Sequence, residues 1–293
     1  MSGAALSPQA DEIRRQLEES EEPSPDLWAA AIGAASELAP AIICLLDKAN
    51  EGVALLPGPE RLLLCGLHAL SAAREPSACP AFLRLLQGPD ERIEQQLGLD
   101  PPLPALLFGM YDGNEDALYA ALETRETPGF GRWVLFQVLA RLVLDGRSSR
   151  ERFIALLDRF DREEMAPADD MAWIAWQETI ACLGLKEFEE RVRGGWERQR
   201  LSLQSFSERE RREWLEQLNG SVADPEGEPR FLSETVPIDD PAAYFARRSE
   251  RLRQIFPELD EADEPDDPND PSKAIRLTDY ELDWLHRFLF SEQ

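Results

Sequence analysis

Residues 60–87, ERLLLCGLHALSAAREPSACPAFLRLLQ, contain two apolar segments separated by a short break, and they decide the fold. Leucines recur at helical spacing in the first segment, which ends before Glu75 and Pro76, and the second segment begins at Pro80. Two apolar helices joined by a short connection are typical of an antiparallel helix pair, in which each helix covers the apolar side of the other. The stretch therefore predicts a helical hairpin.

The same arrangement recurs along the chain, in residues 103–123, 133–161 and 171–201. The step from pair to pair is about 35 to 40 residues, which is the range of helical-hairpin repeats. We therefore predict an all-α protein in which paired antiparallel helices stack as a short HEAT-like α-solenoid. Because the pairs share little sequence identity, an irregular helical bundle is the structural alternative. Earlier helices are expected at residues 9–19, after Ser24 with Pro25 at the first helical position, and at residues 41–50, opened by Pro40.

Capping residues indicate where several helices begin and end. Three pairs have the spacing of a capping box, in which two backbone donors are satisfied reciprocally: Ser148 with Glu151, Ser207 with Glu210, and Thr278 with Glu281. Three dipeptides are suited to helix ends: Asp112-Gly113, Asp145-Gly146 and Asn219-Gly220.

The composition changes after Gly220. Residues 221–241 are rich in turn-forming residues, and residues 257–271 combine Asp and Glu with four prolines. Helices are expected at 242–256 and at 277–290, and the second is apolar enough to dock on the body. The predicted organisation is a helical-repeat body over residues 1–220, followed over residues 221–293 by acidic, proline-rich, loop-containing linkers with two docking helices.

The chain is strongly acidic, with 31 Lys and Arg against 57 Asp and Glu and a formal net charge of −26. This charge repels phosphate backbones and anionic membranes, so a basic protein or peptide is the favoured partner, and nucleic acid and membrane are not expected. No apolar run approaches the length of a spanning helix, and no export signal is recognisable at the N-terminus. We expect a soluble, cytoplasmic protein.

Few residues carry obvious chemistry. Cys44, Cys65, Cys79 and Cys182 lie apart without metal-ligand spacing, which favours small buried thiols over disulfides or a metal site. His68 lies among leucines, as a helix-face histidine does when it is satisfied locally. Templates for nucleophilic, metallopeptidase and phosphate-binding sites do not occur. We predict no catalytic, cofactor-binding or metal-binding residues.

Two sets of residues are candidates for a site. Helices at 208–218 and 244–256 mix arginine with aromatic residues, as interface hot spots do, and the candidate partner-binding residues are Arg211, Arg212, Trp214, Arg247, Arg248 and Arg251. These arginines could instead pair with the chain's own carboxylates. The second set is a carboxylate cluster at a helix junction: Asp112, Glu115 and Asp116. Trp173 and Trp176 are expected in a buried central helix, with an aromatic ligand box as the alternative.

About half of the chain resembles a known family. His68-Ala69-Leu70, the segment 79–86, the segment 103–107 leading to 111–114, and the segment 132–146 followed by Ser149-Arg150-Glu151 resemble, in order and spacing, a bacterial family of uncharacterised HEAT-like helical proteins. This is a domain-of-unknown-function family, and some of its members carry a C-terminal SEC-C zinc motif. The resemblance implies a helical-repeat fold and no established catalytic residues. The cysteine cluster of the zinc motif is absent from this sequence.

The functional expectation is a protein–protein interaction scaffold or adaptor that binds a protein or peptide on a solenoid groove. An enzyme with a carboxylate-lined groove is one alternative, and an acidic mimic of nucleic acid is another.

Overall fold

The computed structural model describes residues 6–97, 102–202 and 204–255, and these residues form α helices and short 3₁₀ helices (η) with no strand among them. The first half of the chain holds α1 (Pro8–Glu19), α2 (Pro25–Gly33), α3 (Ala35–Asn50), α4 (Pro57–Ala72), η1 (Pro76–Ala78), α5 (Cys79–Leu86), α6 (Asp90–Leu97), α7 (Leu103–Gly109) and α8 (Glu115–Glu123). The second half holds α9 (Gly129–Leu144), α10 (Arg150–Arg162), α11 (Met171–Cys182), η2 (Lys186–Phe188), α12 (Glu189–Glu197), α13 (Glu208–Ala223), η3 (Arg230–Thr235) and α14 (Pro241–Ile255).

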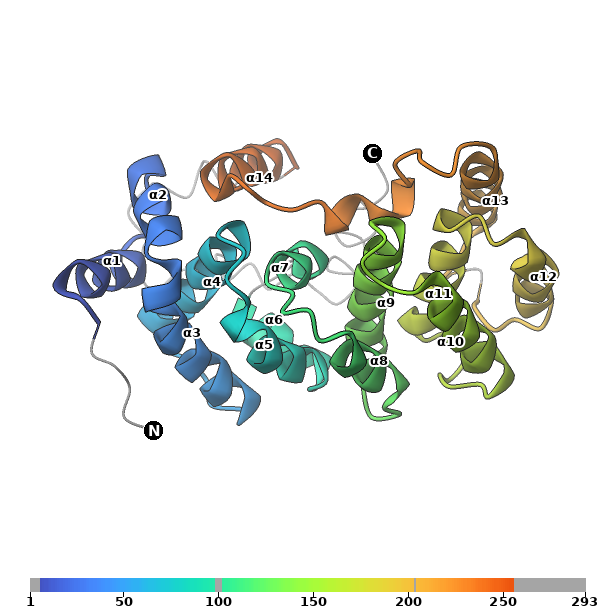
Figure 1. The fold of residues 1–293 in the computed structure, drawn as a ribbon, viewed down its shortest axis with the longest axis horizontal. Helices are drawn as coiled ribbons and strands as arrows, with labels where there is room; N and C mark the ends of the chain where they lie inside the picture. Colours follow the sequence, from blue (N-terminus) through green and yellow to red (C-terminus); the bar gives the residue numbers. More distant parts are fainter. Residues whose placement is uncertain (1–5, 98–101, 203, 256–293) are drawn as a thin grey trace, which may run out of the picture. The chain divides into compact units, whose positions relative to one another are not determined.

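Helices that are not consecutive in the chain pack against one another along the body of the protein. Helix α4 contacts α7, α7 contacts α9, α9 contacts α11, and α11 contacts α13 (Figure 1). We call these five helices the central row. Helix α3 contacts both α4 and α5, while α8 and α10 each contact α9. The backbones therefore approach one another more closely along the central row than between the two helices of each predicted hairpin.

Small residues allow these close approaches. A Cβ atom added at Gly109 of α7 would lie 2.0 Å from Ser71 Oγ of α4, and one added at Gly131 of α9 would lie 2.0 Å from the Leu86 carbonyl oxygen. Both distances are far shorter than a van der Waals contact. The glycines therefore set how near their helices come to the neighbouring elements.

Helices α9 and α11 form the centre of the core because they are apolar on nearly every side. Trp173 and Trp176 of α11 are each 2% exposed, which confirms the expected buried helix. Their indole N–H groups donate to the carbonyl oxygens of Pro167 and Leu157, at 2.8 and 2.9 Å. The two indoles are consequently satisfied and fixed.

The predicted helix boundaries are partly correct. Ser207 and Glu210 form the expected capping box, and Gly146 follows α9 with a φ of +66°. The Ser148–Glu151 box is wrong by one residue, since Ser149 is the residue whose side chain accepts from the backbone of Arg152 at 3.2 Å.

Two further boundaries differ from those predicted. Pro40 does not open a helix but lies inside α3, near its N-terminal end, where its ring removes only one backbone hydrogen bond. Helix α13 continues past Asn219-Gly220 because its next turn is held by contacts: Ser221 is buried and accepts from Gln217 Nε2 at 2.8 Å. The sequence signal at Gly220 was thus overridden by tertiary structure.

The segment after α13 belongs to the body. Leu232 and Thr235 of η3 are 1% and 0% exposed, and η3 contacts α7, α9 and α11. Arg141 of α9 pairs with Glu228, and Arg74 pairs with Asp239 at 2.6 Å. One compact unit accordingly extends past residue 220 to Ala242, because residues 228–239 bury apolar area and form ion pairs with the body.

A second unit begins at Ala243, and its described part is the remainder of α14. The acidic stretch 257–271, the expected helix 277–290 and the Thr278–Glu281 pair lie outside the described residues. In the part of the chain that the structure describes, none of the helices alone has the length and apolar character needed to cross a membrane; α2 and α3 meet those criteria only together, with a 91° bend between them.

Candidate binding site

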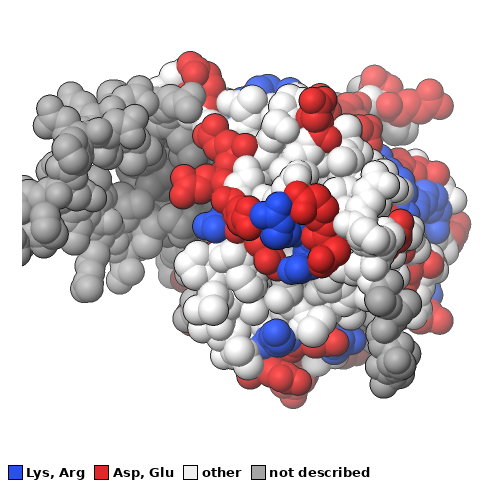
Figure 2. Space-filling model, turned by 90° about the vertical axis from the view of Figure 1, so that its left-hand side faces the viewer, with Lys and Arg blue, Asp and Glu red and all other residues white. Residues whose placement is uncertain are grey.

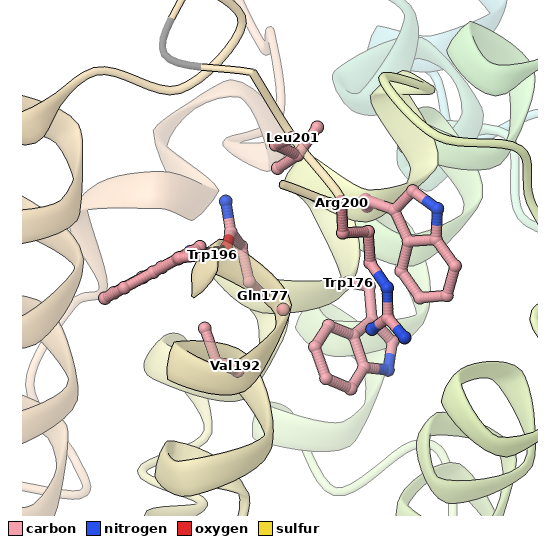
Figure 3. Close-up of a pocket in the computed structure, with 8 residues that line it drawn as sticks. Trp176, Gln177, Val192, Trp196, Arg200 and Leu201 are labelled. Atoms are coloured by element: carbon pink, nitrogen blue, oxygen red, sulfur yellow. Dashed lines mark hydrogen bonds between the residues drawn. The ribbon is translucent and has the colours of Figure 1, made fainter. Parts of the chain in front are cut away.

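A small pocket lies between α11, α12 and the residues that follow α12 (Figure 3). Its empty volume, including the open mouth, is about 210 Å³. The lining residues are Trp173, Trp176, Gln177, Val192, Gly195, Trp196, Arg200 and Leu201. Gln177 and Trp196 stand on one side of the space, and Trp176 and Arg200 stand on the other (Figure 3).

Gln177 joins α11 to both α12 and α13. Its side-chain Oε1 accepts the indole N–H of Trp196 at 2.8 Å, and its backbone carbonyl accepts the indole N–H of Trp214. Gln177 is only 2% exposed, and its Nε2 has no hydrogen-bond partner among the described residues. A buried donor without a partner costs free energy, on the order of 1–3 kcal/mol. Gln177, which lines the pocket, therefore carries a buried hydrogen-bond donor without a partner among the described residues.

Arg200 forms the opposite side of the pocket. Its guanidinium lies 4.0 Å from the centroid of the Trp173 ring, and Nη1 donates to Asp161 Oδ1 at 2.6 Å. Asp161 also binds Arg191, at 2.5 Å. The guanidinium of Arg200 is therefore held in place against the aromatic ring, and it shares the single negative charge of Asp161 with Arg191.

The predicted arginine–aromatic surface of α13 borders this pocket through Trp196. The Arg211 guanidinium lies 5.4 Å from the Trp196 ring centroid and pairs with Glu208 at 3.0 Å. Arg212 is exposed on the same helix. Trp214 requires a correction: its side chain is 0% exposed and packs edge-on against Trp196. It anchors α13 to α11 and has no surface with which to contact a partner.

The arginines predicted on α14 differ in how much they are exposed. Arg247 is exposed, and Arg251 is half-buried. Arg248 is also half-buried, and its Nη1 donates to the Tyr244 hydroxyl at 3.4 Å. Arg247 thus presents a charge to solvent on this helix.

The three carboxylates of the predicted cluster are each engaged by other groups of the protein, and Glu115 and Asp116 share Arg152. Asp112 accepts from the backbone N–H of Asn114 at 2.9 Å, which supports the start of α8. Glu115 accepts from the Ser148 hydroxyl at 2.6 Å, and Asp116 pairs with Arg152 of α10 at 2.7 Å. Within residues 6–97, 102–202 and 204–255, no three His, Cys, Asp or Glu side chains are grouped as metal ligands. The cluster holds α8 against its neighbours.

Three of the four cysteines are buried, as expected for unreactive thiols. Cys65 and Cys79 are buried, and burial raises their pKa to about 12 and about 11, so both stay protonated at neutral pH. Cys182 is buried as well, whereas Cys44 is exposed, because α3 presents that position to solvent. His68 is fully buried, with Nδ1 2.9 Å from the Leu64 carbonyl oxygen, as a locally satisfied histidine should be.

One carboxyl group has an unusual environment. Glu178 of α11 is partly buried, and desolvation raises its pKa to about 8; the negative charge of Glu234 adds to the rise, while the Trp133 side chain opposes it. A carboxyl that titrates near neutral pH makes the stability of this region dependent on pH.

Comparison of the chain with family models, with curated proteins and with solved structures returns no match. The pocket residues Gln177, Trp196 and Arg200 were not predicted as a site from the sequence. The available signal was weak: Gln177 is a polar residue inside an otherwise apolar helix, and such residues usually satisfy a structural hydrogen bond.

Proposed function

We propose that this protein is an interaction scaffold: a short HEAT-like α-solenoid that binds a protein or peptide partner on its helical surface. The observation that supports this most is the succession of contacts along the central row, α4 to α7 to α9 to α11 to α13. Stacked helices that contact mainly their neighbours create extended surfaces suited to binding a polypeptide. The pocket beside Trp196 is one concave, aromatic feature on such a surface.

The charge of the chain favours a basic partner. With a net charge of −26, the protein attracts cationic segments over long range and speeds their encounter. The acidic groups are interspersed with basic ones on the face at the α1 end (Figure 2), where Arg14 and Arg15 each pair with two carboxylates of their own helix. Such interspersion weighs against mimicry of a phosphate backbone, which requires an uninterrupted array of negative charge.

The enzyme alternative has less support. Catalytic carboxylates need environments that separate their pKa values, whereas Asp112, Glu115 and Asp116 are engaged in capping, hydroxyl binding and ion pairing. We therefore keep the scaffold as the proposed function.

The test begins with capture of the tagged full-length protein from its native cell at low and at moderate salt, followed by reconstitution of any retained protein from purified components. The proposal expects a stoichiometric complex that survives moderate salt. Arg212→Ala should weaken it about fivefold or more if Arg212 is an interface hot spot. Arg162→Ala is the matched control, since that side chain is 64% exposed on α10. If purified components form no complex, the scaffold proposal fails.

A further inference from the structure

Residues 228–236, which we call the strap, include η3 and lie against α7, α9 and α11. Leu232 and Thr235 are the buried residues of the strap. Arg141 of α9 holds it in place: the guanidinium donates to the Thr235 hydroxyl at 3.0 Å and to the Leu232 carbonyl oxygen at 3.5 Å. The same guanidinium pairs with Glu228. The strap is therefore bound to the body by burial and by hydrogen bonds from one arginine.

Acidic side chains from three elements come together where the strap meets α11. The charged groups that act on Glu178 of α11 are Glu234 of the strap and Glu210 of α13, and both are acidic. The Trp133 side chain of α9 hydrogen-bonds to Glu178 and favours its charged form. Burial and the two like charges act in the opposite direction and outweigh this bond.

The proton on Glu178 therefore depends on the strap. While the strap is bound, burial and Glu234 raise the pKa of Glu178 to about 8, so the carboxyl is protonated at neutral pH. Release of the strap would take Glu234 away and admit water, and the pKa would fall towards its ordinary value. Because the bound form holds this proton more tightly than the released form, the binding of the strap must weaken as the pH rises.

We propose that the strap is a pH-sensitive element: it stays on α9 and α11 while Glu178 keeps its proton, and it detaches when Glu178 ionises beside Glu234. The helices beneath it stay folded, because the core of α9 and α11 is formed by their own packing, including the fixed indoles of Trp173 and Trp176. Detachment exposes the sides of α7, α9 and α11 that η3 contacts. This inference does not depend on the proposed scaffold function.

The four cysteines of the chain provide the means to detect detachment. Cys182, the last residue of α11, is 2% exposed, and the backbone N–H of Phe231 in the strap hydrogen-bonds to its sulfur. Its thiol should become reactive when the strap detaches. Cys44 is exposed and serves as a reference in the same sample. Cys65 and Cys79 are buried in α4 and α5, so their reaction would report unfolding of the body.

The test labels the full-length protein with iodoacetamide at several pH values and measures the rate at each cysteine by mass spectrometry of peptides. The rate at Cys182 divided by that at Cys44 should rise by up to about tenfold per pH unit between about pH 6 and pH 8. Cys65 and Cys79 should stay unlabelled. Glu178→Gln should keep the ratio low and constant, because glutamine cannot ionise. Glu216→Gln removes the same charge from an exposed position of α13 and should behave like the wild type.

Leu232→Ala tests the geometry separately from the titration. It removes the buried apolar side chain of the strap and should raise the Cys182 to Cys44 ratio at every pH. A variant that labels like the wild type would show that the strap does not shield Cys182, and the inference would fail. A wild-type ratio that is independent of pH, or that rises equally in Glu178→Gln, would also overturn it. Labelling of Cys65 and Cys79 in step with Cys182 would show global unfolding instead of release of the strap.

Discussion

Trp196 donates its indole N–H to Gln177 Oε1 at 2.8 Å, and this hydrogen bond links α12 to the central helix α11. Gln177 in turn receives the Trp214 indole at its backbone carbonyl, so one residue of α11 holds both following helices. The same bond determines that Nε2 is the atom of the Gln177 amide left without a partner among the described residues.

Trp196→Phe should destabilise the protein by roughly 1–3 kcal/mol, because it leaves the buried Oε1 of Gln177 without its donor. Phenylalanine keeps one aromatic ring against Trp214 but lacks the second ring of the indole, so part of the effect is lost packing. Chemical denaturation with urea measures the effect. A variant as stable as the wild type would show that this bond contributes nothing to holding α12.

Glu178→Gln should make the protein less sensitive to pH. The folded-state pKa of Glu178 is raised to about 8 from 4.5, so the folded protein favours the protonated form. The stability that this form provides is fully present below about pH 4.5 and is lost as the pH rises through 8. The melting temperature of Glu178→Gln should therefore exceed that of the wild type by a margin that grows between pH 5 and pH 9. A constant margin would contradict the raised pKa.

Arg132→Met should destabilise the protein by about 2–4 kcal/mol. The Arg132 side chain is 1% exposed, and it donates to the carbonyl oxygens of Met165 and Thr124 at 2.7 and 2.8 Å. Removing the guanidinium leaves both oxygens without this donor. Arg162→Met serves as a control on α10, since an exposed ion pair contributes only about 0–1 kcal/mol. Equal effects of the two changes in urea denaturation would show that the buried contacts do not matter.

Gly131→Ala should be strongly destabilising, because the added Cβ would lie 2.0 Å from the Leu86 carbonyl oxygen, a backbone atom that cannot move alone. At Gly33 nothing lies within 4 Å of an added Cβ, and Gly33→Ala should be neutral or stabilising by up to about 1 kcal/mol. The difference in melting temperature between the two variants tests the close approach of α9 to residue 86. If both variants melt alike, that approach is looser than the structure indicates.

The helical class and several boundaries could be predicted from local sequence, because apolar periodicity and caps such as Ser207 are local properties. Two boundary signals were misleading: Gly220 lies within α13, whose last turn includes the buried Ser221, and Pro40 lies within α3, near its N-terminal end. The association of η3 with the body was missed because its buried Leu232 and Thr235 lie in a segment whose composition is typical of a surface loop.

The pocket could not be predicted for a related reason. Trp196 donates its indole N–H to the oxygen of the Gln177 amide, and this leaves the nitrogen, Nε2, as the free end. The two residues are brought together only by the packing of α12 on α11. Sequence patterns did point to the arginine–aromatic character of α13. They could not distinguish the exposed Arg212 from the buried Trp214, because this depends on which side of α13 faces α11.

Hydrogen–deuterium exchange of the reconstituted complex, read by mass spectrometry, tests the central claim most directly. If the helical surface is a binding scaffold that receives the partner beside Trp196, the partner should slow exchange in peptides covering α11, α12 and residues 198–202. Exchange in α1, at the other end of the sequence, should be unchanged. Unaltered exchange throughout α11 and α12 in a saturated complex would contradict the account.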